Sequence, residues 1–202
     1  MIFHSFAAMM IQNNDFWEKK YVNNEIGWDL GGVSEPLKNY FDQLENKDLE
    51  ILIPGAGNAY EAEYLHHLGF KNVHVIDWAQ SALDNFKKRV STFPTKNLHQ
   101  VDFFAFEGKF DLVVEQTFFC AITPDLRTKY VDKMHNLLNP KGKIAGLLFN
   151  IPLNTEHPPY GGNQAEYEML FTEKFNIKTM ETAHNSIAPR HGNELFVIFE
   201  KK

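Results

Sequence analysis

Short apolar runs that alternate with helical patterns constrain the fold of this chain more than any other feature of its sequence. The runs are almost continuously apolar, as expected of strands that are buried on both faces of a sheet. Stretches with helical hydrophobic spacing separate them. Strands joined through helices form a parallel sheet with right-handed crossovers, and ligands bind beyond the carboxyl ends of such strands. The four clearest runs are residues 49–53, 72–77, 110–115 and 143–149.

Helix signals fill the gaps between these strands. Ser34 is placed to cap a helix that has Pro36 in its first turn, and Thr123 is placed to cap another. Residues 139–142, Asn-Pro-Lys-Gly, predict a turn. The other predicted elements are a short strand at 97–102 and helices at 14–23, 59–68, 79–90 and 163–171.

Two further strands are predicted at the end of the chain, at 175–185 and 194–202. No helix of useful length fits between them, so they should pair antiparallel. The predicted order is therefore a strand–helix repeat followed by a hairpin. The length of 202 residues suits one domain, and we expect a single domain over 1–202.

Composition excludes several classes of protein. The chain is 44% hydrophobic and 23% charged, which is typical of a folded globular protein. A formal charge of −6 argues against a nucleic-acid partner. A single cysteine excludes an intrachain disulfide and favours a reducing compartment, here the cytoplasm. No apolar run approaches the roughly 20 residues that span a bilayer, so no membrane partner is expected, and we favour a monomer.

The first residues are apolar, but they do not read as a signal peptide, because a positive n-region is missing and the charged DFWEKK follows at once. We expect 1–12 to be disordered or loosely docked, unless Met9 or Met10 is the true start. Residues 13–47 are expected to form a lid segment and a helix over the rest of the domain.

A nucleotide site is predicted at the carboxyl ends of the first three strands. Gly55 and Gly57 allow a tight turn that leads into a helix N-terminus, where free N–H groups favour anions. Asp77 ends the second strand, where an acid binds ribose hydroxyls. Asp102 ends the third strand, and its carboxylate with the Phe103 ring suits an adenine. Each residue alone could be structural, but the three successive strand ends together favour a nucleotide.

The kind of nucleotide follows from what is missing. A dinucleotide fingerprint has a third glycine where this chain has Tyr60, and a P-loop lysine is absent. An antiparallel last strand also suits enzymes that use S-adenosylmethionine. Two alternatives stay open, namely an NAD(P)-dependent oxidoreductase and an inactive module that binds a cofactor or a partner.

Several segments resemble the thiopurine S-methyltransferase family, and most closely its thiol and halide methyltransferase branch. The resemblance implies a three-layer, Rossmann-like class I methyltransferase fold of α/β class, with a seven-stranded, mostly parallel sheet whose last strand is antiparallel. It also implies S-adenosyl-L-methionine as the cofactor and a small-molecule acceptor. The segments are FWEKKYVNNEIGWDLGG (16–32), ILIPGAGNAYEAEYL (51–65), VIDWAQSAL (75–83), VDFF (101–104), FDLVVEQTFFCAITPDLR (110–127) and PPYGG (158–162).

The resemblance also implies roles for individual residues. Gly55 would approach the methionine part of the cofactor, and Gln116 would face the cofactor near the acceptor. Relatives often carry an aromatic residue at the position of Gln116, so the acceptor preference could differ here. The remaining implied contacts are Trp17, Tyr21 and Trp28 over the methyl-transfer site, Asp77 at the ribose, and Asp102 with Phe103 at the adenine.

Methyl transfer from a sulfonium needs alignment and exclusion of water more than it needs an acid or base. Aromatic faces also attract the cationic sulfonium. We therefore expect positioning residues, with Gln116, His157 and Tyr160 as the candidates at the acceptor. Cys120 has apolar neighbours and is expected to be a buried structural thiol. The histidines show no metal-ligand spacing, so no metal is expected.

Overall fold

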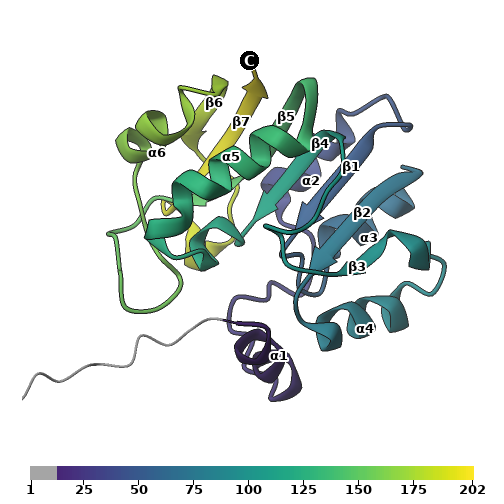
Figure 1. The fold of residues 1–202 in the computed structure, drawn as a ribbon. Coiled ribbons are helices and arrows are strands. Elements are labelled where there is room, and N and C mark those ends of the chain that lie inside the picture. Colours follow the sequence, from purple (N-terminus) through teal and green to yellow (C-terminus); the bar gives the residue numbers. More distant parts are fainter. Residues whose placement is uncertain (1–12) are drawn as a thin grey trace, which may run out of the picture.

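The computed structural model describes residues 13–202, in which seven strands form one sheet between two layers of helices (Figure 1). The strand order is β3-β2-β1-β4-β5-β7-β6, and β7 runs antiparallel to both β5 and β6. The predicted α/β class and the antiparallel last strand are confirmed. The strands are β1 (Glu50–Pro54), β2 (Asn72–Asp77), β3 (Leu98–Gln100), β4 (Phe110–Gln116), β5 (Leu138–Phe149), β6 (Phe175–Thr182) and β7 (Glu194–Lys201).

Each face of the sheet is covered by its own helices and has its own apolar core. Side chains alternate between the faces along β1, so that Leu52 joins one core, whereas Ile51 and Ile53 join the other. The helices are α1 (Asn14–Val22), α2 (Glu35–Asp42), α3 (Tyr60–His67), α4 (Gln80–Arg89), α5 (Arg127–Leu137) and α6 (Gln164–Phe171). Residues of α5 and α6 pack in the Leu52 core, and residues of α2, α3 and α4 pack in the other.

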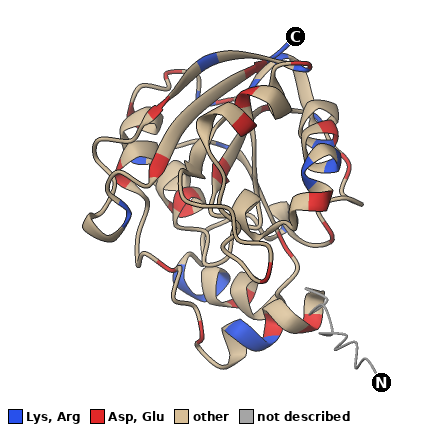
Figure 2. Ribbon diagram, turned by 90° about the vertical axis from the view of Figure 1, so that its left-hand side faces the viewer, with Lys and Arg blue, Asp and Glu red and all other residues tan. Residues whose placement is uncertain are grey.

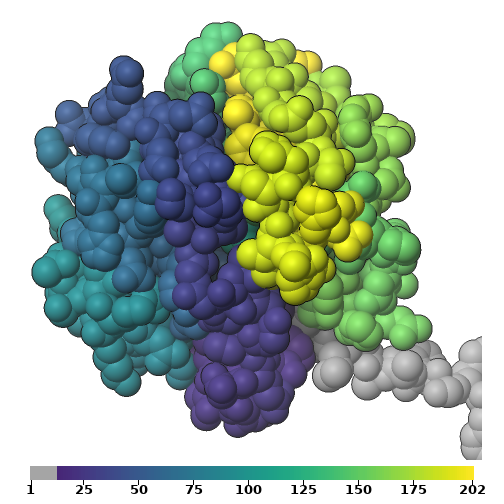
Figure 3. All heavy atoms as spheres, turned by 180° about the vertical axis from the view of Figure 1, so that it is seen from behind, coloured from purple at the N-terminus to yellow at the C-terminus, as the bar shows by residue number. Residues whose placement is uncertain are grey.

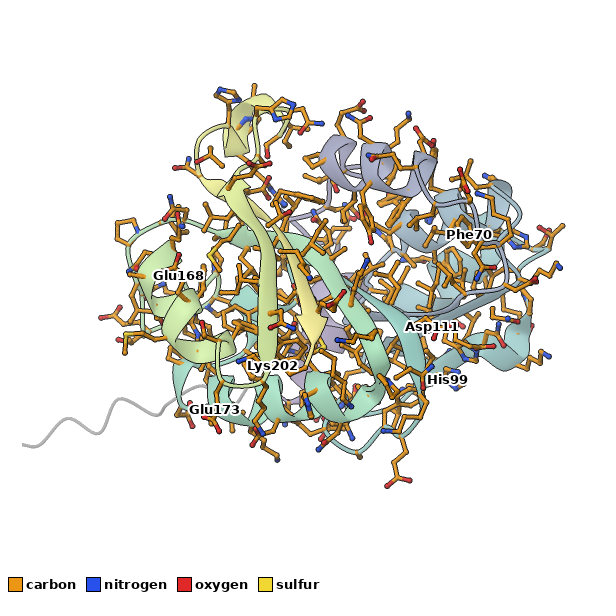
Figure 4. The ribbon with its side chains drawn as sticks, turned by 90° about the horizontal axis from the view of Figure 1, so that it is seen from above. Phe70, His99, Asp111, Glu168, Glu173 and Lys202 are labelled. Carbon is orange, nitrogen blue, oxygen red and sulfur yellow. The ribbon has the colours of Figure 1, made fainter. Side chains whose placement is uncertain are left out.

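Side chains fill both layers along the full width of the sheet (Figure 4). Glu168 and Glu173 lie at one end of the sheet, and Phe70 and His99 lie at the other. Lys and Arg residues are interspersed with Asp and Glu residues on the ribbon (Figure 2), without a large face of one sign. Within residues 13–202, no helix is long and apolar enough to cross a membrane.

The predicted turn at 139–142 is wrong. These residues lie inside β5, as an irregularity in its pairing with β4. Phe110 pairs with Leu138, but Leu112 already pairs with Lys143, so β5 holds extra residues at this point. A Cβ on Gly142 would lie 3.0 Å from the carbonyl oxygen of Phe110, so the glycine lets the extra loop stay against the sheet.

The two predicted helix caps differ in detail from the structure. Ser34 does stand at the N-cap of α2, but its side chain makes no capping hydrogen bond, and its backbone N–H donates to Glu61 Oε1 at 3.2 Å. Thr123 precedes a 3-10 turn, Pro124–Leu126, and α5 begins only at Arg127. Both sequence signals therefore mark where a helical turn starts, but neither side chain serves as the cap.

The N-terminal segment lies across the sheet edge where the parallel strands end. In Figure 1, α1 stands beyond the carboxyl ends of β1, β2 and β4. From behind, the segment that leads from α1 to α2 runs between the blue-to-teal half of the molecule and the yellow C-terminal residues (Figure 3). The lid at 13–47 stays a prediction. The expectations for 1–12 lie outside the described residues.

Candidate active site

A cavity of about 970 Å³ lies at the carboxyl edge of the sheet, beneath the N-terminal segment. It extends from the end of β3 to the end of β5, and the loops that follow the first five strands contribute to its wall. This volume is at the upper end of the range for small-molecule sites. The predicted site residues that line it are Trp17, Tyr21, Trp28, Gly55, Gly57, Asp77, Asp102, Phe103, Gln116 and His157.

The glycine loop after β1 has the conformation that its sequence predicts. Gly55 and Gly57 both have positive φ, at 55° and 54°. A Cβ on Gly55 would clash with the Phe118 ring, and one on Gly57 would clash with the Tyr21 hydroxyl. The two glycines therefore allow an aromatic side chain from the turn after β4 and one from α1 to lie directly on the loop.

Asp77 fixes this loop from the end of β2. One carboxylate oxygen accepts the backbone N–H of Gly57 at 2.8 Å, and the other accepts that of Ala79 at 2.8 Å. Burial raises the pKa of Asp77, and these two N–H groups oppose that rise. Each carboxylate oxygen can still accept a second hydrogen bond, so structural and ligand-binding roles are compatible here.

The third strand is shorter than predicted, and this moves Asp102 off its end. The strand stops at Gln100, and Asp102 opens a turn in which its side chain accepts the Phe104 N–H at 2.8 Å. Phe103 is only 5% exposed, and its ring packs 5.1 Å from that of Phe118. Phe103 thus belongs to the core as well as to the cavity wall, while Phe104 beside it is half-buried.

The three aromatic residues of the N-terminal segment form one cluster on the cavity. The ring of Trp28 meets Trp17 edge-on at 5.6 Å and Tyr21 edge-on at 6.0 Å. Burial, reinforced by the charge of Asp77, raises the pKa of the Tyr21 phenol, which therefore stays neutral. Arg190 Nη2 donates to the Trp28 carbonyl at 2.8 Å and ties the cluster to the C-terminal part of the chain.

The turn after β4 is organised by a buried acid, Glu115. Its carboxylate accepts the N–H groups of Phe118 and Phe119, each at 2.8 Å, and the hydroxyl of Tyr130. Burial raises the pKa of Glu115 to about 7. This arrangement holds Gln116 at the cavity, where its buried Oε1 has no hydrogen-bond partner. An unpaired buried acceptor is costly, and a ligand donor would relieve that cost.

The two acceptor candidates in the loop after β5 have different positions. His157 is exposed at the cavity rim, with Nδ1 3.1 Å from the Pro158 carbonyl oxygen. Tyr160 is 3% exposed and does not line the cavity, so the structure does not support its role as an acceptor contact. Its N–H donates to the Cys120 carbonyl at 2.7 Å, and Arg127 Nη2 holds the Gly161 carbonyl at 2.6 Å, which anchors this part of the loop in the core.

Cys120 is buried, as predicted, with Sγ 3.2 Å from the Thr117 carbonyl oxygen. Burial raises the pKa of this thiol, so it is protonated and a poor nucleophile. Within residues 13–202, no three His, Cys, Asp or Glu residues come together in a way that could hold a metal ion.

Four residues at the site were not singled out by their sequence. Phe118 covers Gly55, Glu18 reaches α4, and Asp29 meets Asn58 beside the glycine loop. Asp29 does lie in the glycine-punctuated segment between the first two helices, but nothing in the sequence spacing links it to a residue 29 positions later.

Comparison with known proteins identifies the kind of site. A sequence profile of the thiopurine S-methyltransferase family matches residues 12–201. The chain belongs to this family. It is therefore an S-adenosylmethionine-dependent methyltransferase, and the resemblance inferred from its motifs is confirmed. Membership also argues against the dinucleotide oxidoreductase alternative.

Relatives within the family carry several names. The chain is 29% identical to the probable thiol methyltransferase 2 of Arabidopsis thaliana, over 94% of this chain and 86% of that protein. It is 27% identical to thiocyanate methyltransferase 1 of Brassica oleracea, over 88% of this chain and 81% of that one. It is 25% identical to a thiopurine S-methyltransferase of Vibrio parahaemolyticus, over 93% of this chain and 99% of that protein.

Solved structures support the fold. The 1,6-didemethyltoxoflavin-N1-methyltransferase of Burkholderia thailandensis, solved with S-adenosylhomocysteine, superposes with a TM-score of 0.78 at 14% identity, over 94% of this chain and 87% of that one. At this identity the likeness shows a shared methyltransferase fold and nothing about the acceptor.

The cavity of this family member suits S-adenosylmethionine. Two buried acceptors on its wall, Asn58 Oδ1 and Gln116 Oε1, have no partner, so they are available to ligand donors. The two cationic residues on the wall are already paired, Lys20 with Glu25 at 2.7 Å and Arg190 with Glu194 at 3.1 Å. The acidic side chains on the wall therefore make the electrostatic potential in the cavity negative, which favours a cationic ligand.

One polar contact ties the lid helix α1 to the body of this methyltransferase, and we expect its loss to weaken cofactor binding. Glu18 accepts the backbone N–H of Ser81 at 3.1 Å, and also the Ser81 hydroxyl, at the N-terminus of α4. No residue of α1 is fully buried, so little apolar packing replaces this contact. Glu18→Ala should raise the Kd for S-adenosylhomocysteine roughly three- to tenfold in isothermal titration calorimetry.

The matched control is Glu45→Ala, which removes an exposed acid from the same N-terminal segment but does not line the cavity. It should leave the Kd within about twofold, because surface substitutions away from a contact have small effects. Equal Kd values for Glu18→Ala and the wild type would contradict a lid role for this contact.

Proposed function

We propose that this protein transfers the methyl group of S-adenosylmethionine to a small, soft nucleophile: a thiol, hydrosulfide or halide. The proposal rests on one observation, the kind of side chains that line the half of the cavity formed by the loops after β4 and β5. Within residues 13–202, that half is lined mainly by apolar side chains, and its interior holds no group suited to take a proton from a weakly acidic acceptor. Its lining includes Phe118, Cys120, Ile122, Leu126, Phe149 and Pro159.

The titratable groups in this half support the proposal. The thiol of Cys120 is kept protonated by burial. Arg190 is bound to Glu194, and its guanidinium lies 5.4 Å from the Phe149 ring. His157 stands at the exposed rim. A hydroxyl or amine acceptor would have to lose a proton here without a base, whereas a thiolate, hydrosulfide or halide brings its own electron pair.

The roles of individual residues follow from where they lie. The cofactor supplies an activated methyl group on a positively charged sulfur. Trp17, Tyr21 and Trp28 would cover that charge with aromatic faces and keep water out. Asp77 would accept the ribose hydroxyls, and Asp102 would accept the adenine amino group while Phe103 packs on the ring. The acceptor's lone pair forms the new bond to carbon as the old carbon–sulfur bond breaks and its electrons return to sulfur.

Gln116 is the residue on which we place acceptor alignment. It ends β4, between the nucleotide half of the cavity and the apolar half, and its Oε1 lacks a partner. Its amide is neutral, so it orients an acceptor without changing its charge. His157 stays a rim candidate in this proposal.

A panel of acceptors tests the proposal. Methyl transfer from labelled S-adenosylmethionine should be readily measured with sulfide, aromatic thiols, thiopurines or iodide, and should be at least about 100-fold slower with phenols and amines of similar size. Faster transfer to the phenols or amines would overturn it. Cofactor binding with no turnover on any acceptor would favour the inactive binding module. We also infer a cytoplasmic monomer, which sedimentation and fractionation would check.

A further inference from the structure

An acid beside the glycine loop has no cationic partner within residues 13–202. The Asp29 carboxylate accepts the Gly31 N–H at 2.6 Å and a hydrogen bond from Asn58 Nδ2, and both donors are neutral. Asp29 lies on the cavity wall, directly after Trp28 of the lid cluster. The structure therefore places one net negative charge at this point of the wall.

The Asp29 carboxylate also acts on the groups around it. Burial and then the charge of Asp29 raise the pKa of the Tyr60 phenol, and Asp29 also contributes to the raised pKa values of Tyr21 and Glu61. Arg89, which also faces Tyr60, already binds Glu63 at 2.6 Å while its guanidinium lies 4.4 Å from the Tyr60 ring.

The second observation is the orphaned oxygen of Asn58. The donor Nδ2 of this amide faces Asp29, which fixes its orientation, so Oδ1 is the atom left buried without a partner. Asn58 directly follows Gly57 and also lines the cavity. A carboxylate and an adjacent unpaired amide oxygen together form an acceptor pair that suits a group with several N–H donors and a positive charge.

We propose that Asp29 and Asn58 bind the α-ammonium group in the amino-acid part of the cofactor and thereby select ligands that carry it. The inference rests on the methyltransferase activity described above, but it does not depend on the acceptor. Asp77 ends β2, and Asp102 lies in the turn after β3. Asp29 and Asn58 would therefore recognise a different end of the ligand.

Three ligands separate this role from a general effect on binding. S-Adenosylhomocysteine carries both the ammonium and the carboxylate, S-adenosyl-3-thiopropylamine keeps only the ammonium, and 5′-methylthioadenosine has neither. With Asp29→Asn, calorimetric Kd values for the first two should rise about tenfold or more, because a charged hydrogen bond is lost. The Kd for 5′-methylthioadenosine should change less than about twofold. Asn58→Ala should show the same ligand pattern with a smaller rise, of about threefold.

Glu45→Gln, an exposed acid in the same N-terminal segment that does not line the cavity, is the matched control and should leave all three Kd values unchanged. Thermal melts check that each variant is folded. If Asp29→Asn does not fold, Asn58→Ala tests the proposal in its place. An equal rise for all three ligands, or no rise for any, would overturn the assignment. If the wild type binds none of the three, the cofactor assignment itself fails, which is a different result.

Discussion

Replacing Asp77 by alanine should raise the Kd for S-adenosylhomocysteine by about 100-fold or more. The carboxylate accepts the backbone N–H groups of Gly57 and Ala79, and in our proposal it also accepts the ribose hydroxyls. Alanine removes both the hydrogen bonds to the ligand and the hydrogen bond that holds the glycine loop at Gly57. Hydrogen bonds to a charged group contribute about 1.5–3 kcal/mol each, and 1.4 kcal/mol corresponds to a tenfold change in Kd. Calorimetry on the purified variant measures the effect.

The matched control is Asp84→Ala, which removes an exposed acid from α4. It should bind S-adenosylhomocysteine like the wild type, which would show that the charge lost at Asp77 acts locally. A folded Asp77→Ala protein with a Kd within about threefold of the wild type would refute the ribose role.

The second large effect concerns the pH dependence of stability through Glu115. Burial raises its pKa in the folded protein to about 7, above the ordinary glutamate value of 4.5. Between these values the folded state keeps a proton that the unfolded state has released, so the free energy of unfolding falls as pH rises. The stability loss is complete above pH 7 and amounts to on the order of 3 kcal/mol.

Glu115→Gln isolates this effect, because an amide does not ionise. Denaturant titrations of both proteins from pH 4.5 to 8 should show the wild type losing stability relative to the variant, while histidine titrations cancel in the difference. Parallel curves would contradict the raised pKa. Glu115→Ala should instead cost several kcal/mol at every pH, because Phe118 N–H, Phe119 N–H and the Tyr130 hydroxyl lose their acceptor.

Local patterns predicted which residues line much of the cavity. The apolar runs located the strands, and parallel strands bring their carboxyl ends to one edge, so the residues that follow them had to gather there. This reasoning placed Gly55 and Gly57 in the turn after β1, where the backbone adopts positive φ. It also placed Asp77 at the end of the neighbouring strand, where its carboxylate faces that turn. The positions of Trp17 and Trp28 over the methyl-transfer site were inferred from the family resemblance, because no sequence spacing predicts them.

The errors also have physical causes. Asp102 was predicted to end a strand, but its side chain competes for a backbone N–H and opens a turn. Residues 139–142 are of types that favour a turn. However, β4 pairs with Leu138 before them and with Lys143 after them, and this keeps them in the sheet. Tyr160 was expected at the acceptor because it lies in the loop after the fifth strand, whereas the structure places it in the core, with hydrogen bonds to Cys120 and from Arg127.

The sequence by itself determined the order of strands and helices, the edge of the sheet where the cavity lies, and the family. These follow from period, turn chemistry and motif, which are local properties of the chain. Only the tertiary structure decided which groups meet across that edge. Glu18 with Ser81, Asp29 with Asn58, and Phe118 with Gly55 come together because the N-terminal segment and the β4 turn dock on the glycine loop. Docking depends on packing between elements far apart in the chain, and no local pattern encodes it.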